Sequence, residues 1–235
     1  MPTLVLLPGL MCDYHVWSAQ RIFLEDRCNC FIPKYEMLNS LSSMADHVLQ
    51  SVENEKFSLA GHSMGGRVAL EIMRLAPQRV THLALLDTGT HALSPGLPGE
   101  QERSKRLALL LQATQFGMRS MGLNWAAPMV HPDSREGILF EGILDMLERS
   151  SPRQFQAQIE ALLEREDSSA LLPNISCPTL VMCGRQDTWS SPEQHEVMAK
   201  SIPNSKIVVV ENCGHMCTLE QPEVVNAALL NWLTS

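Results

Sequence analysis

The sequence predicts an α/β fold: a mostly parallel sheet of about six strands flanked by helices, with a helical lid inserted between two of the strands. Short, almost continuous apolar runs end in turn residues, which is typical of strands covered on both faces. Helical patterns alternate with these runs, which favours right-handed crossovers between parallel strands. The alternation then stops for about eighty residues, from about His91 to Asn174, where only helical patterns occur.

Each element has its own signal along the chain. The predicted strands are the apolar runs Leu4–Leu7, Phe57–Ala60, His82–Leu86, Thr179–Cys183 and Lys206–Val210, with a weaker sixth at Cys28–Ile32. The helical patterns between them are Tyr14–Leu24, Ser43–Glu53, Gly66–Leu75, Pro192–Ser201 and Pro222–Leu233. Within the insertion, helices are expected near Gln101–Gln115, Ser134–Arg149 and Pro152–Arg165. Residues 1–90 and 175–235 therefore form the expected core, and residues 91–174 form a lid over the carboxyl ends of the strands, where such sheets bind ligands.

Composition restricts the class of protein. The 235 residues carry a formal net charge of -8, with 45% apolar and 19% charged residues. An acidic balance argues against a nucleic-acid partner or an anionic membrane surface. No apolar stretch reaches the length needed to span a bilayer, and the first residues indicate a strand rather than a signal peptide. The seven scattered cysteines favour a reduced, cytoplasmic protein without a metal site.

Residues 61–65 read Gly-His-Ser-Met-Gly, between a predicted strand and a predicted helix. A serine flanked in this way lies at the apex of a sharp strand-to-helix turn, which exposes its hydroxyl as a nucleophile. Gly61 and Gly65 lack a β-carbon, so they relieve the crowding of so tight a turn. Ser63 is therefore the candidate nucleophile.

A nucleophilic serine needs a base to take its proton and an acid to orient that base. Asp187 follows the strand Thr179–Cys183, in Gly-Arg-Gln-Asp, and His215 follows the strand Lys206–Val210, in Cys-Gly-His. Both therefore come from loops at the edge of the sheet where Ser63 lies. The order Ser, Asp, His completes a candidate catalytic triad.

These motifs, together with Leu-Leu-Pro-Gly-Leu at 6–10, resemble the α/β-hydrolase superfamily in its small, lid-bearing esterase-like branch. The resemblance covers nearly the whole chain. It implies an oxyanion hole formed by the backbone N–H groups of Met64 and Leu10. Pro8 stands where the family usually has His, but a main-chain donor survives that change. The chain starts at the oxyanion strand without the family's usual hairpin, so the sheet is expected to be trimmed to parallel strands.

Several residues have a second interpretation. Asp87 also ends a strand and is an alternative triad acid, although a structural carboxylate in a turn is the favoured interpretation. His62 is expected to be a hydrogen-bonded structural residue. Cys12, Cys213 and Cys217 near the site are interpreted as buried packing residues rather than as redox groups.

The lid and the loops should line an apolar pocket. The candidate pocket residues are Met11, Met118, Met121, Trp125 and Trp189. Arg119 is a lid cation that could bind a substrate carboxylate, against the plainer interpretation of a solvated surface arginine.

The leading hypothesis is hydrolysis of a small carboxylic ester or related acyl compound with an apolar acyl or alkyl part. Hydrolysis of a C–C bond, or a lyase reaction, on the same triad is the alternative. A ligand-binding protein on a hydrolase scaffold is a third hypothesis, which the intact triad disfavours. No cofactor is implied, because the chain has neither a Walker loop nor a dinucleotide-binding glycine motif. The sequence leaves the oligomeric state open.

Overall fold

The computed structural model describes residues 1–235 and contains one six-stranded sheet. The strand order is β2-β1-β3-β4-β5-β6, and every neighbouring pair is parallel. The strands are β1 (Thr3–Leu7), β2 (Asn29–Phe31), β3 (Phe57–His62), β4 (Val80–Leu86), β5 (Thr179–Gly184) and β6 (Ser205–Val210). The four inner strands are almost wholly buried, because helices cover both faces of the sheet.

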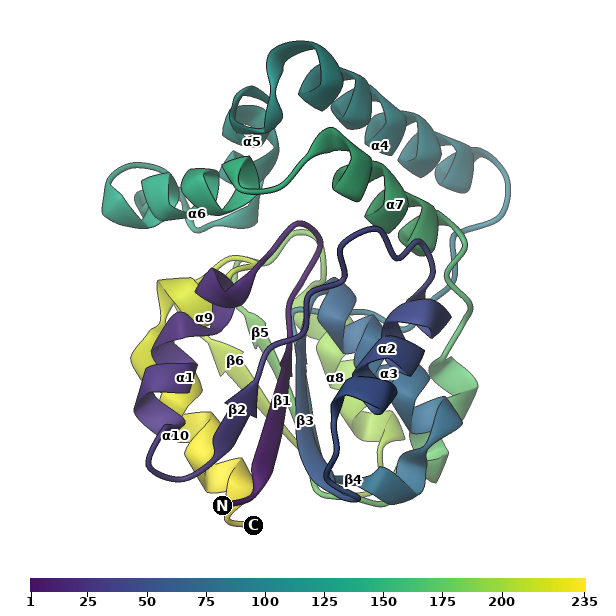
Figure 1. Ribbon diagram of the computed structural model, residues 1–235, viewed down its shortest axis with the longest axis vertical. Helices are drawn as coiled ribbons and strands as arrows, with labels where there is room; N and C mark the ends of the chain where they lie inside the picture. Colours follow the sequence, from purple (N-terminus) through teal and green to yellow (C-terminus); the bar gives the residue numbers. More distant parts are fainter.

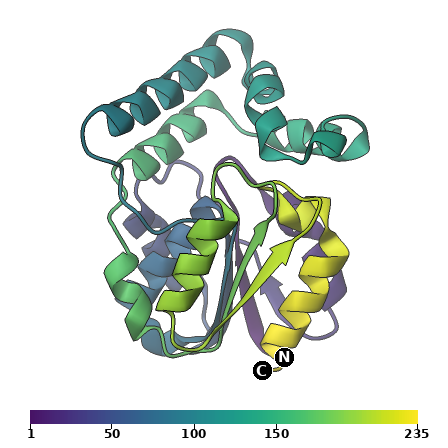
Figure 2. The ribbon, with the colours of Figure 1, turned by 180° about the vertical axis from the view of Figure 1, so that it is seen from behind.

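Two layers of helices cover the sheet (Figure 1). One face is covered by α2 (Leu41–Ser51), α3 (Met64–Leu75) and α8 (Pro192–Ser201). The other is covered by α1 (Ser18–Leu24) and α10 (Pro222–Leu233), with the short α9 (Cys217–Glu220) beside them. The view from behind shows both termini at the foot of α10, at the end of the sheet opposite the helices inserted between β4 and β5 (Figure 2).

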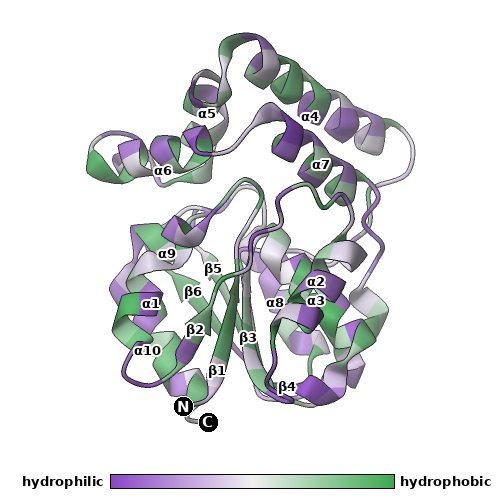
Figure 3. Cartoon of the chain, in the orientation of Figure 1, coloured by the Kyte–Doolittle hydropathy of each residue, from purple (hydrophilic) through white to green (hydrophobic).

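The segment between β4 and β5, called the lid below, contains four α-helices and no strand. They are α4 (Leu97–Phe116), α5 (Met118–Ala126), α6 (Ile138–Glu148) and α7 (Pro152–Leu163), and they lie across the carboxyl edge of the sheet. Short 3-10 turns at Tyr14–Trp17, Pro77–Arg79, Ala127–Met129, Pro132–Ser134 and Ser169–Asn174 complete the chain. The strands are the most apolar elements, whereas polar and apolar residues alternate along the lid helices (Figure 3).

The predicted fold class is confirmed: six parallel strands, flanked by helices. The predicted elements differ from the observed ones mainly at their ends, and the strand at Cys28–Ile32 shortens to three residues. Two helices, α5 and α9, were not predicted. Gly117, with φ of 86°, separates α5 from α4, and Gly122 interrupts the pattern of α5, so its helical signal is weak. Helix α9 has only four residues, too few to show a helical period.

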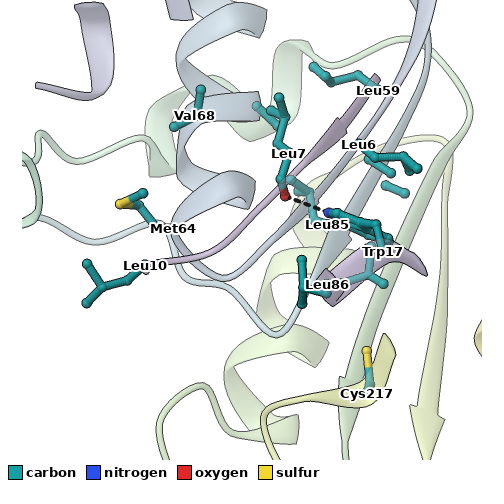
Figure 4. Close-up of a cluster of buried hydrophobic side chains, with 14 of the residues drawn as sticks. Leu6, Leu7, Leu10, Trp17, Leu59, Met64, Val68, Leu85, Leu86 and Cys217 are labelled. Carbon is teal, nitrogen blue, oxygen red and sulfur yellow. Dashed lines mark hydrogen bonds between the residues drawn. The ribbon is translucent and has the colours of Figure 1, made fainter. Parts of the chain in front are cut away.

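A cluster of buried apolar side chains lies at the ends of the inner strands, close to Met64 (Figure 4). Leu6, Leu7, Leu59 and Leu85 come from three adjacent strands and are fully buried. Trp17 packs against them, and its indole N–H donates a hydrogen bond to the Leu7 carbonyl at 3.1 Å. This packing holds the ends of the inner strands, from which the site emerges.

Candidate active site

The turn at Ser63 has the backbone strain that its sequence predicts. Ser63 has φ of 54° and ψ of -117°, a conformation that L-residues rarely adopt. A β-carbon on Gly61 would lie 2.3 Å from the Gly65 carbonyl oxygen, and one on Gly65 would lie 2.2 Å from the Leu7 carbonyl oxygen. Only glycine fits at either position, because the atoms that a β-carbon would meet belong to the backbone and cannot rotate away.

Hydrogen bonds from the neighbouring strand hold this strained turn. The Ser63 N–H donates to the Leu86 carbonyl at 2.9 Å, and the Thr88 hydroxyl donates to the Ser63 carbonyl at 2.7 Å. The Thr88 N–H in turn donates to Nε2 of the buried His195 at 3.1 Å. The end of β4 and the first turn of α8 therefore support the conformation of Ser63.

The structure brings Ser63, His215 and Asp187 together. His215 Nε2 lies 2.8 Å from Ser63 Oγ, and His215 Nδ1 lies 2.8 Å from Asp187 Oδ2. Because a carboxylate can only accept, Nδ1 carries the proton and Nε2 is free to accept one from the serine hydroxyl. Asp187 Oδ1 accepts the N–H groups of Trp189 and Ser190 at 2.8 Å and 3.0 Å. This is the geometry of a general base next to a nucleophile.

The pKa shifts of His215 and Asp187 suit a general base and the carboxylate that orients it. Burial alone would lower the pKa of His215, but the charge and hydrogen bond of Asp187 outweigh it and raise that pKa. Burial likewise opposes ionisation of Asp187, yet the charge of His215 and the hydrogen bonds from His215, Ser190 and Trp189 lower the Asp187 pKa. The carboxylate therefore stays ionised and stabilises an imidazolium.

Asp87, the alternative acid, has different partners. Its two oxygens accept the N–H groups of Gly184 at 3.0 Å and Cys217 at 3.2 Å, and it makes no hydrogen bond to the His215 ring. Burial and the charge of Asp187 raise the pKa of Asp87 to about 7. His62 is also buried, and its Nε2–H donates to the His215 carbonyl at 2.7 Å. Asp87 and His62 thus tie the loops of the site together from below.

The loop that carries His215 is organised by Glu220. Its carboxylate accepts the N–H groups of His131 at 2.6 Å, Gly214 at 2.9 Å and Met216 at 3.3 Å. The His215 N–H donates to the Met129 carbonyl at 2.5 Å. The loop is therefore fixed both by α9 and by the segment that follows α5.

Leu10 and Met64, the two residues predicted to supply oxyanion donors, line the same cavity as Ser63. Neither N–H has an acceptor among the loop and turn hydrogen bonds of the chain, so both are available to a ligand. The next N–H, that of Met11, donates to Oε1 of Gln158 on α7 at 2.8 Å in a buried contact. Helix α7 therefore holds the loop at Leu10 and Met11 in place.

A cavity of about 610 Å³ lies between the sheet edge and the lid, and Ser63 and His215 are on its wall. Of the predicted pocket residues, Trp125 and Trp189 line it, and their rings lie 5.6 Å apart. The structure places the other three elsewhere. Met118 and Met121 are buried in the packing of the lid itself, and Met11 turns away at φ of 60°, with its sulfur near Ser150. Helical periodicity locates buried methionines but not the side of the lid on which they are buried.

Arg119 is not in the cavity either. Its guanidinium forms ion pairs on the outside of the lid with Glu141, Asp145 and Glu148 of α6. The cations that do line the cavity are Arg67, Lys105, Arg106 and Arg165, and the carboxylates that line it are Glu102 and Asp87. Sequence reasoning missed these residues, because they come from three separate segments.

Of the three cysteines near the site, Cys12 lines the cavity, whereas Cys213 and Cys217 are fully buried. Burial, with the charge of Asp13, raises the pKa of Cys12 to about 12, and burial also raises the pKa of Cys213 and Cys217. No group of three or more His, Cys, Asp or Glu side chains is placed to hold a metal ion. Among the helices, none combines the length and apolarity needed to cross a membrane.

Comparison with known proteins identifies the family. The model of a family described as the alpha/beta hydrolase family matches residues 4–228. The chain belongs to this family. A similar solved structure is a thermophilic esterase from Thermogutta terrifontis with malate bound, at 30% identity and a TM-score of 0.83, covering 100% of this chain and 90% of that one. The enol-lactonase from Burkholderia xenovorans LB400, at 20% identity and a TM-score of 0.85 over 100% and 92% of the two chains, shares the fold.

Curated relatives of this alpha/beta hydrolase include the 2-hydroxy-6-oxononadienedioate/2-hydroxy-6-oxononatrienedioate hydrolases 1 and 2 of Pseudomonas putida. Hydrolase 1 is 29% identical over 191 residues, which is 80% of this chain, and hydrolase 2 is 30% identical over 193 residues, which is 76% of it. The matched region spans only 66% and 63% of the lengths of these two relatives.

Proposed function

We propose that this protein is a serine hydrolase that cleaves a small carboxylic ester or related acyl compound. The observation that carries the proposal is the His215 ring, which bridges Ser63 Oγ and Asp187 Oδ2 at 2.8 Å each. Members of the family use many chemistries on one fold, so the site and not the fold supports this choice.

The mechanism follows from these contacts. Ser63 Oγ attacks the carbonyl carbon while its proton moves to His215 Nε2, and Asp187 stabilises the resulting imidazolium. The carbonyl oxygen becomes an oxyanion that accepts the N–H groups of Leu10 and Met64. Collapse breaks the bond to the leaving group, which takes the proton from His215. Water then attacks the acyl-enzyme by the same route and releases the acid and free Ser63.

Aryl esters of graded acyl length test this proposal. Ser63→Ala should lower kcat by about 10³ or more, since loss of the nucleophile leaves only the binding and oxyanion contributions. Ser51→Ala, at an exposed position on α2, is the matched control and should hydrolyse esters as the wild type does. Equal turnover by Ser63→Ala would refute the mechanism. If no fluorophosphonate adduct forms at Ser63, the protein is better described as a ligand-binding protein on a hydrolase scaffold.

Hydrolysis of a C–C bond is the second candidate, because a specific observation favours it. The Pseudomonas putida relatives act on dioates, and the Thermogutta terrifontis esterase has malate bound. The cavity of this protein likewise contains cations that suit carboxylates. The test substrate is a dicarboxylate with a β-diketone group, and its turnover is measured as loss of its enol absorbance. Turnover of this compound, with no turnover of any aryl ester, would select C–C bond hydrolysis.

A further inference from the structure

The cavity has an excess of positive charge that the mechanism does not use. The chain contains 18 Lys and Arg residues against 26 Asp and Glu, yet four cations and only two carboxylates, Glu102 and Asp87, line this one cavity. These side chains therefore carry a formal excess of two positive charges. So many cations on one cavity wall in an acidic protein require a physical reason, because like charges at close range repel one another.

Part of the cluster is satisfied within the protein. Glu102 of α4 accepts both Nη1 and Nη2 of Arg165 at 2.9 Å, and it also pairs with Arg106 at 2.8 Å. Arg165 further donates to the carbonyl groups of Leu162 and His91. Both arginines are therefore already paired: Arg165 joins the two ends of the inserted segment, and Arg106 pairs with Glu102 within α4.

Arg67 and Lys105 have no such partners. Arg67 makes one hydrogen bond, from Nη1 to the His91 carbonyl at 2.9 Å, and no ion pair to any carboxylate. Lys105 makes neither a hydrogen bond nor an ion pair. Burial, followed by the charges of Arg165 and Arg106, lowers the pKa of Arg67 to about 9, and the charges of Glu102 and Asp167 offset this shift only in part.

The position of Arg67 relates the cluster to the chemistry. Arg67 and Ser63 are four residues apart at the start of α3, which is about 6 Å along a helix axis. Both side chains line the same cavity, as do the apolar Leu109, Leu162 and Trp125. A substrate with its acyl carbon at Ser63 can therefore extend along the cavity toward the open cations.

We infer that Arg67 and Lys105 bind a second, anionic group of the substrate, so that the natural substrate is an acyl compound ending in a carboxylate or a phosphate. The inference rests on the function proposed above. The half-buried guanidinium of Arg67 and the exposed ammonium of Lys105 can both form charge-assisted hydrogen bonds with either anion. An uncharged acyl chain would leave the Arg67 guanidinium without an anion when it excluded water from the cavity, at a cost in binding free energy.

Paired substrates test this inference. One set contains mono-4-nitrophenyl esters of dicarboxylic acids of increasing chain length, and each ester is compared with the neutral one in which a methyl group replaces the carboxylate. The wild type should prefer the charged ester in kcat/KM at one or more lengths. Arg67→Gln and Lys105→Gln should each lower the charged-to-neutral ratio about tenfold, as expected for loss of one hydrogen bond to a charged group.

Arg103→Gln is the matched control, because it removes the same charge from an exposed position on α4 that does not line the cavity. It should keep the wild-type ratio. A wild type that favours the neutral ester at every length would overturn the inference, as would ratios that Arg67→Gln and Lys105→Gln leave unchanged. If Arg67→Gln does not fold, Lys105→Gln at its exposed helical position decides the result.

Binding without turnover separates this inference from the proposed function. Calorimetric titration of Ser63→Ala with the free dicarboxylates and with inorganic phosphate reads the anion site alone. Binding that Lys105→Gln weakens supports the site even if the ester mechanism fails, and the stronger of the two ligands assigns the anion. Absence of binding by both ligands would refute the site even if ester hydrolysis is confirmed.

Discussion

Asp187→Asn is the most informative perturbation of the proposed triad, because the backbone dictates how the new amide must lie. Asp187 Oδ1 accepts two backbone N–H groups, from Trp189 and Ser190, and Oδ2 accepts His215 Nδ1–H. Asparagine has one carbonyl oxygen and one NH2 group. The amide oxygen must face the N–H groups of Trp189 and Ser190, since an NH2 group in its place would leave both N–H groups without an acceptor. The NH2 group therefore faces His215 Nδ1.

This orientation reverses the tautomer of the base. Nδ1 must now accept a hydrogen bond, so the imidazole proton moves to Nε2, the nitrogen that lies 2.8 Å from Ser63 Oγ. A protonated Nε2 cannot accept the serine proton. The loss in kcat for a wrong tautomer is about 10⁴. At about 1.36 kcal/mol for each factor of ten, this is about 5 kcal/mol of transition-state stabilisation.

The assay is kcat for an aryl ester in the wild type, Asp187→Asn and Asp87→Asn. In Asp87→Asn the amide loses one of the two acceptors used by Gly184 and Cys217, so its main effect should be a stability loss of about 1–3 kcal/mol. Its kcat should fall far less than that of Asp187→Asn. The reasoning would be refuted if Asp187→Asn stayed within tenfold of the wild type, and a larger fall in Asp87→Asn would make Asp87 the acid.

Three further outcomes are expected. The pKa of His215 is raised, and only the neutral ring accepts a proton, so kcat/KM should be lost as the pH falls through a value above 6.5; a pH profile with its acid limb well below 6.5 would contradict this. Gly65→Ala places a β-carbon 2.2 Å from the Leu7 carbonyl oxygen and should cost about 2 kcal/mol or more in urea unfolding, whereas a loss below about 0.5 kcal/mol would show that the turn can move. Gln158→Leu leaves the buried Met11 N–H without an acceptor and should lower both stability, by about 1–3 kcal/mol, and kcat, while an unchanged kcat would show that the lid does not hold the oxyanion loop.

The lid shows where prediction from sequence ends. Trp125 lines the cavity as predicted, but Met118 and Met121, on the same helix, pack within the lid. All three residues are apolar and lie at helical spacing. Spacing along a helix shows that residues share a face, but it does not show whether that face meets a cavity or another helix.

The supports of the site are equally invisible in the sequence. Thr88 directly follows Asp87 at the end of a predicted strand, so its position weakly indicated a place near the site. His195 and Gln158 gave none, because their partners Thr88 and Met11 are more than one hundred residues away in the chain. Such contacts depend on how separate layers pack, which no local pattern encodes.

The sequence by itself determined the α/β fold, the strained turn at Ser63 and the positions of Asp187 and His215 at strand ends. These follow from local rules, since parallel strands bring their carboxyl ends to one edge of a sheet. Only the tertiary structure decided that the His215 ring lies between Ser63 and Asp187 and that Arg67 and Lys105 line the same cavity. The physical reason is that the cavity is formed by α3 and the lid together, and its charge is a property of neither segment alone.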